Sequence, residues 1–202
     1  MRRYIPSREL KISLVSAQNM DGLGYAVVRR SRLRDGPQST TCHRPVFNKE
    51  AKTNEEEFEV TASTLRRSRE EFDKLALGST SAGKTQILLI GKHLAQQGNW
   101  EALLDPFYRD TKSTVTARIA LVEGPVSDVL HFSPNNKPRL PLHLSNLIDT
   151  AVFRNETTKT NLQEFHRQLK EKGIMPSMTV LRKEKDIIIL GTALLDKHAR
   201  NR

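Results

Sequence analysis

The sequence predicts an α+β fold, in which small antiparallel sheets from N- and C-terminal hairpins pack with a central helical region. Strand-like runs lie near both ends of the chain, at 10–16 and 25–30 and again at 178–181 and 187–190. The middle of the chain, at about 62–97, carries apolar residues at helical spacing. Strands and helices do not alternate regularly enough to predict a doubly wound sheet.

Turn-forming residues separate the two strands of each expected hairpin. Residues 19–24 (NMDGLG) lie between the first pair, and the charged segment 182–186 (RKEKD) lies between the second pair. The stretch 35–57 is rich in glycine, proline, asparagine and hydroxyl residues, so we expect a flexible loop there. The chain is therefore predicted to have two parts, a basic N-terminal hairpin with its loop over 1–57 and an α+β main domain over 58–202.

Between the hairpins the pattern predicts further helices and strands. Helices are expected at 64–77, 84–97, 99–104, 142–153 and 161–172, and strands at 114–122 and 129–132. The last helix is the best marked, because Thr160 and Gln163 form a T-x-x-Q capping box and Gly173 stands where the helix should stop. Trp100 and Phe107 are expected to anchor the core.

Composition limits the class of protein and of partner. The chain has 202 residues with 37% hydrophobic content, enough for a modest core, and a formal net charge of +10. Such a charge favours polyanionic partners: nucleic acid, an anionic membrane surface or an acidic protein. The one cysteine, Cys42, excludes an intramolecular disulfide. No apolar run is long enough to span a bilayer and the N-terminus does not resemble a secretory signal, so we expect an intracellular protein, of the cytoplasm or the nucleus.

One segment matches a chemical motif in full. Gly78, Gly83, Lys84 and Thr85 occupy the required positions of the phosphate-loop pattern G-x-x-x-x-G-K-[ST]. In such a loop backbone N–H groups surround the phosphates, the lysine contacts the outer phosphates and the hydroxyl binds Mg²⁺. The pattern therefore predicts a nucleotide site for ATP or GTP with magnesium.

The surroundings of this motif agree with it only in part. A phosphate loop follows a buried strand and opens a helix. The expected helix at 84–97 fits, but 64–77 has helical rather than strand-like spacing. Glu123, at the end of an apolar run, could supply the acid that holds magnesium. Two interpretations stay open: a nucleotide site, or a Gly/Ser connection between two helices.

Three functions are compatible with these observations. The first hypothesis is a basic non-enzymatic protein that binds nucleic acid, RNA before DNA, through salt-sensitive phosphate contacts. The contacts would come from two arginine clusters: Arg29, Arg30, Arg32 and Arg34, and Arg66, Arg67 and Arg69. The alternatives are a phosphate-loop protein that binds a nucleoside triphosphate, and a structural or interaction protein, such as a small viral matrix-like or accessory protein, that binds anionic surfaces. The first hypothesis assigns no catalytic residue, cofactor or metal site, because the histidines lack metal-ligand spacing.

Overall fold

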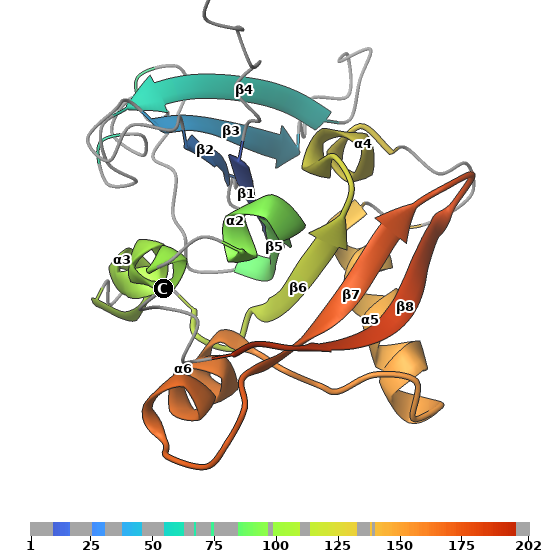
Figure 1. The fold of residues 1–202 in the computed structure, drawn as a ribbon. Coiled ribbons are helices and arrows are strands. Elements are labelled where there is room, and N and C mark those ends of the chain that lie inside the picture. The colour runs from blue at the N-terminus through green and yellow to red at the C-terminus, as the bar shows by residue number, and fades with distance from the viewer. Residues whose placement is uncertain are drawn as a thin grey trace, which may run out of the picture.

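Helices cover both faces of the C-terminal part of one mixed β-sheet, which confirms the predicted α+β class (Figure 1). The structure, a computed structural model, describes residues 10–16, 26–30, 38–45, 55–62, 67, 74, 85–96, 99–109, 114–132, 138 and 140–196. For the first four of these ranges it describes the backbone only.

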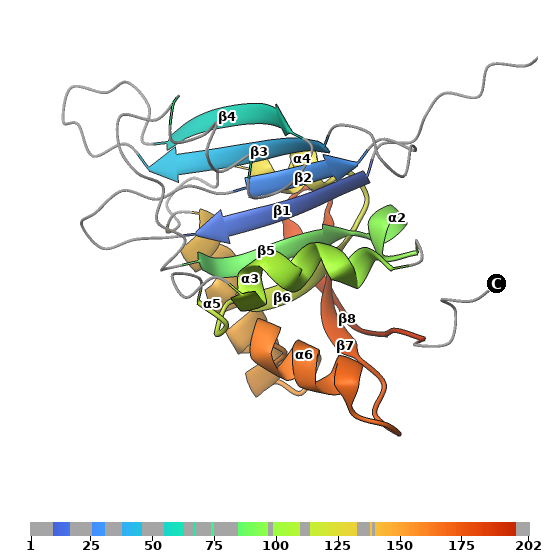
Figure 2. The same ribbon diagram turned by 90° about the vertical axis from the view of Figure 1, so that its left-hand side faces the viewer.

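The described strands form one eight-stranded sheet, in the order β4-β3-β2-β1-β5-β6-β7-β8 (Figure 1, Figure 2). They are β1 (Leu10–Ser16), β2 (Ala26–Arg30), β3 (Gln38–Pro45), β4 (Glu55–Ala62), β5 (Thr85–Gly91), β6 (Arg118–Glu123), β7 (Ser177–Lys183) and β8 (Ile187–Leu194). β5, β6 and β7 run parallel, and every other neighbouring pair is antiparallel. Both expected hairpins, β1–β2 and β7–β8, are confirmed, and the parallel centre joins them into a single sheet.

The described helices are α2 (Lys92–Ala95), the 3-10 helix η2 (Trp100–Leu104), α3 (Asp105–Arg109), α4 (Val126–Leu130), α5 (Leu140–Phe153) and α6 (Leu162–Lys170). The helices predicted over 142–153 and 161–172 are confirmed as α5 and α6. The predicted capping box of α6 is wrong. The N-cap is Asn161, whose side-chain oxygen accepts a hydrogen bond of 2.7 Å from the backbone N–H of Glu164, whereas Thr160 is buried against β7.

The prediction of a helix over 84–97 is wrong, because residues 85–91 form β5 at the centre of the sheet. Successive side chains of a strand point to opposite faces, and both faces of β5 are covered by helices. A strand buried on both faces therefore reads as a continuous apolar run, which periodicity cannot distinguish from a buried helix. The strand predicted at 129–132 is also wrong, since Val129 and Leu130 belong to α4.

The N-terminal part of the chain contains more strands than predicted. The stretch 35–57, expected as a loop, includes β3 and the start of β4, which pair along eight residues each. The predicted boundary between 57 and 58 lies inside β4. The division of the chain into 1–57 and 58–202 stays a prediction.

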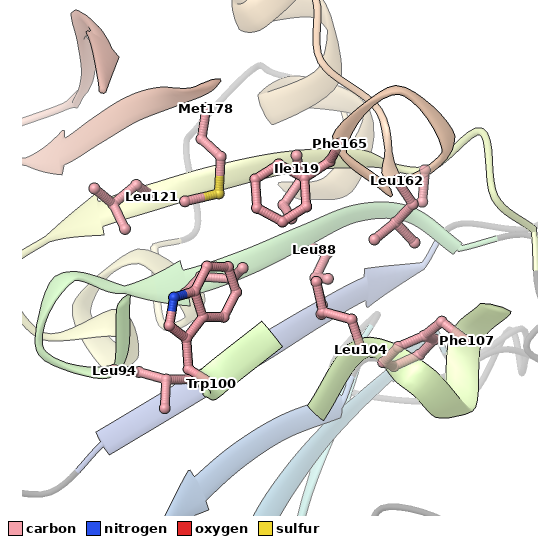
Figure 3. Close-up of a cluster of buried hydrophobic side chains, with 12 residues drawn as sticks. Leu88, Leu94, Trp100, Leu104, Phe107, Ile119, Leu121, Leu162, Phe165 and Met178 are labelled. Carbon is pink, nitrogen blue, oxygen red and sulfur yellow. The ribbon is translucent and has the colours of Figure 1, made fainter. Parts of the chain in front are cut away.

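Two apolar clusters hold the helices to the sheet, one on each face. The first, shown in Figure 3, combines residues of β5, β6 and β7 with η2, α3 and α6: Leu88, Ile90, Leu94, Trp100, Leu104, Phe107, Ala117, Ile119, Leu121, Leu162, Phe165 and Met178. The second lies under α4 and α5: Ile87, Leu89, Ala120, Val122, Val126, Val129, Leu130, Leu140, Leu144, Ile148, Leu181 and Ile187. Trp100 and Phe107 are buried in the first cluster, so their predicted role as core anchors is confirmed.

Candidate functional site

The carboxyl ends of the three parallel strands lie next to one another along one edge of the sheet (Figure 1). Ligands of open α/β sheets bind most often at such an edge. β5 leads directly into Lys92 at the start of α2, β6 ends at Glu123, and β7 ends at Arg182 and Lys183. Charged residues of three neighbouring strand ends therefore gather at this edge, which makes it a candidate functional site.

Glu123 is the centre of an ion-pair cluster at this edge. One of its carboxylate oxygens accepts a hydrogen bond of 2.5 Å from Lys92 Nζ, and the other accepts one of 2.6 Å from Arg182 Nη2. Arg182 also contacts Glu184 at 3.2 Å. Glu123 does end a strand, as the sequence suggested, but both of its oxygens bind cations of the chain itself. The arrangement is typical of a bridge between neighbouring strand ends rather than of a magnesium ligand.

We expect the Glu123 carboxyl to titrate far below its ordinary range. Hydrogen bonds from Lys92 first, and from Arg182 second, lower the pKa of Glu123 from the ordinary value of 4.5 to about 2. Because the pKa of the folded state is the lower one, the stabilising effect is complete above pH 4.5 and is lost as the pH falls through about 2. A carboxyl-detected NMR titration should place the midpoint near 2, and Lys92→Gln should raise it.

A control titration separates the ion-pair effect from a general effect of the fold. Asp128, an exposed acidic residue in the first turn of α4, serves as the internal comparison in the same experiment. A midpoint of Glu123 near 4.5, unchanged in Lys92→Gln, would contradict the cluster. Added salt should weaken the shift, since side chains of Lys92 and Glu123 are 47% and 31% exposed.

A second polar feature is a pocket of about 190 Å³ between η2–α3 and α6. Its lining consists of Asn99, Glu101, Ala102, Asp105, Tyr108, His166, Leu169 and Lys170. The Tyr108 hydroxyl donates a hydrogen bond of 3.2 Å to the Leu162 carbonyl, and its ring lies 4.4 Å from that of His166. Burial, and after it the Asp105 carboxylate, raises the pKa of Tyr108, so its hydroxyl stays protonated. This hydroxyl therefore joins two helical segments and is not an activated nucleophile.

The part of the chain that the structure describes contains neither a metal-binding cluster nor a membrane-spanning helix. No group of three or more histidine, cysteine, aspartate or glutamate side chains is placed there to hold a metal ion. No helix among the same residues has the length and apolar character needed to cross a membrane.

The structure places few of the arginines that the sequence singled out. Arg29 and Arg30 end β2, where only the backbone is described, and Arg67 is an exposed helical residue. Arg32, Arg34, Arg66 and Arg69 lie outside the described residues. Most of the two predicted arginine clusters therefore lies outside the described residues.

The phosphate-loop interpretation disagrees with the fold. Gly78, Gly83 and Lys84 lie outside the described residues, but Thr85 is the buried first residue of β5. A phosphate loop requires a helix to begin at this point, so that its N-terminal N–H groups face the phosphates. A strand begins here instead, and the eight residues match the pattern in sequence without its structural context.

Sequence reasoning found one member of the charged cluster and missed its partners. Glu123 was recognised because it follows the apolar run of β6. Lys92 was assigned to a helix over 84–97, and Arg182 to the charged turn at 182–186. Recognising 85–91 as a strand would have placed Lys92 at a strand end, next to Glu123.

Comparison with known proteins identifies the family. A family model described as "Spore germination protein N-terminal domain" matches residues 32–183. No curated protein matches the chain. Among solved structures, one titled "Crystal Structure of the GerBC protein" matches with 12% sequence identity and a TM-score of 0.36, over 92% of this chain and 52% of that one. The chain thus spans about half the length of that protein, and a similarity at this level carries no argument about the site.

The family match corrects the functional predictions. Nucleic-acid binding through the arginine clusters is wrong, and so are the alternatives of a phosphate-loop protein and a small viral protein. The expected location in the cytoplasm or the nucleus is wrong as well. Of the expected partners, nucleic acid has no support in the match, whereas a membrane surface or a protein partner agrees with it.

Proposed function

The chain belongs to the family of spore germination protein N-terminal domains, and from this membership we propose that it is part of a non-catalytic subunit of a germinant receptor. The subunit would reside at the outward-facing side of the inner spore membrane and bind other membrane-associated proteins of the receptor. The single observation that carries this proposal is the family match over residues 32–183.

The surface supports a binding role. Five large apolar side chains are exposed among the described residues: Leu142, Phe153, Met175, Leu190 and Leu194. The most prominent is Phe153 in the last turn of α5, whose side chain is 88% exposed. Residues that follow α5 contact β8, since the Thr157 hydroxyl lies 3.1 Å from the Gly191 carbonyl. Phe153 is therefore the described apolar side chain with the largest exposed fraction available to a partner.

Germination of spores that lack this chain tests the proposal. In the spore-forming organism that encodes it, we expect deletion to abolish the response to at least one germinant, measured as the fall in optical density of a spore suspension. Expression of the intact chain should restore the response. A tagged version should appear in the membrane fraction of broken spores. Normal germination with every germinant tried, together with recovery of the tagged chain from the soluble fraction, would overturn the proposal.

A matched pair of variants tests the surface. Phe153→Ser should slow germination. It should not lower the amount of protein, because a side chain that is 88% exposed makes few packing contacts that stabilise the fold. Leu142→Ser, near the other end of α5 and 43% exposed, should leave germination unchanged. Equal effects of the two substitutions would argue against a binding surface at the Phe153 end of α5.

A further inference from the structure

The strand β8 ends the sheet, and among the described strands it pairs only with β7. Its sequence, IIILGTAL, contains neither a charge nor a proline. Edge strands of soluble domains usually carry such residues, which prevent pairing with other strands. A bulge at Leu190 interrupts the β7–β8 register, but residues 191–194 pair regularly with residues 177–180 of β7. This second half of β8 is therefore a regular and uncharged edge.

The hydrogen-bond pattern shows which backbone groups face outward. The Leu195 N–H donates to the Pro176 carbonyl at 2.8 Å, so residue 195 forms a hydrogen-bonded pair with β7. In an antiparallel ladder such pairs alternate with pairs that are not hydrogen-bonded. Ala193 consequently faces β7 with its N–H and C=O, whereas those of Thr192 and Leu194 face away from the sheet.

The side chains of Thr192 and Leu194 at this edge are exposed, and that of Thr192 is held in place by hydrogen bonds. Leu194 is 62% exposed. The Thr192 hydroxyl accepts a hydrogen bond of 3.1 Å from the Thr158 N–H and lies 3.1 Å from the Thr157 hydroxyl. The loop after α5 therefore fixes Thr192, and a preformed edge loses less conformational freedom when it binds.

We propose that this edge pairs with the same edge of a second copy of the chain. The two strands would run antiparallel about a two-fold axis at Ala193, so that Thr192 of each copy lies opposite Leu194 of the other. Each of these pairs would exchange two backbone hydrogen bonds, because their N–H and C=O groups both face outward. The edge is self-complementary in this register, and it carries no charge that would repel its copy. Two-fold symmetry is the commonest arrangement of homo-oligomers. The inference does not depend on the proposed receptor function.

Sedimentation velocity of the 202-residue chain at increasing concentration tests this pairing. We expect a monomer–dimer equilibrium. Leu194→Pro removes an outward N–H without removing a hydrogen bond to β7, and Leu194→Lys adds a charge to the edge. Each substitution should raise the dissociation constant of the dimer by about tenfold or more. The control is Leu142→Lys, the same chemical change at an exposed leucine of α5, which should leave the dimer intact. Circular dichroism shows whether the proline variant folds, and the lysine variant tests the same point without a change of backbone.

Hydrogen exchange locates the interface. The amides of Thr192 and Leu194 should exchange more slowly as concentration rises, whereas that of Ala193, already bonded to β7, should change little. A chain that stays monomeric up to about millimolar concentration would overturn the proposal. So would a dimer that both Leu194 variants leave unchanged, because that dimer would use another face.

Discussion

Replacement of Phe165 by alanine should lower the free energy of unfolding by about 3–5 kcal/mol, the range for truncating a buried aromatic side chain. Phe165 is completely buried, and it projects from α6 into the cluster that joins this helix to the sheet (Figure 3). Its ring centroid lies 5.8 Å from that of Trp100, which comes from η2 on the same face. The substitution would therefore remove the contact between two helical segments as well as one between helix and sheet.

A second phenylalanine provides the matched control. Phe153→Ala removes the same atoms from a side chain that is 88% exposed, so its effect should stay within about 0.5 kcal/mol. Both variants are measured by urea denaturation, with the slope of the transition compared with that of the unmodified chain. A loss of equal size in the two variants would contradict the burial of Phe165 and the position of α6 on the sheet.

Replacement of Thr157 by valine should cost about 1–3 kcal/mol of unfolding free energy, because it leaves buried polar partners without a hydrogen bond. The Thr157 side chain is buried, and its hydroxyl lies 3.1 Å from each of the Thr179 hydroxyl, the Gly191 carbonyl and the Thr192 hydroxyl. Valine has nearly the same shape, so the loss would come from hydrogen bonding rather than from packing. These hydrogen bonds join the loop after α5 to both strands of the C-terminal hairpin, and the substitution measures how much they stabilise the fold.

Thr150→Val is the corresponding control. The Thr150 hydroxyl donates a hydrogen bond of 2.8 Å to the Asn146 carbonyl on the exposed side of α5, where water can replace it. Its substitution should change the free energy of unfolding by less than about 0.5 kcal/mol. Thermal and urea denaturation of the two valine variants give the comparison. If Thr157→Val left the free energy of unfolding unchanged, the hydroxyl group would not be needed to hold the loop against β7 and β8.

The predictions that succeeded depend on local sequence signals. The β7–β8 hairpin has two short apolar runs around a charged turn, and α6 has apolar residues at helical spacing with Gly173 beyond its last turn. Each signal involves residues close together in the chain, so it can be read without knowledge of the rest. The α+β class follows from the order of such elements. Glu123 was also found locally, because it is the first charged residue after an apolar run.

The predictions that failed required contacts between distant segments. β5 is a strand because β1 and β6 flank it and helices cover both of its faces, none of which is visible in residues 85–91 alone. The phosphate-loop motif had the right residues, but its function depends on the helix that should follow it, and that segment is β5. Family membership came from comparison over residues 32–183, since no short motif of the chain indicates it.

By itself the sequence determined the fold class, both terminal hairpins, α5, α6 and the strong positive charge, since each depends on composition or on short-range periodicity. Only the tertiary structure decided that the two hairpins share one sheet with a parallel centre, and that Lys92 and Arg182 converge on Glu123. Parallel pairing joins strands through long connections, and strand ends that meet in space are 31 and 59 residues apart in the chain. Local patterns cannot encode such separations. The cluster of Lys92, Glu123 and Arg182 could therefore be identified only in the folded chain.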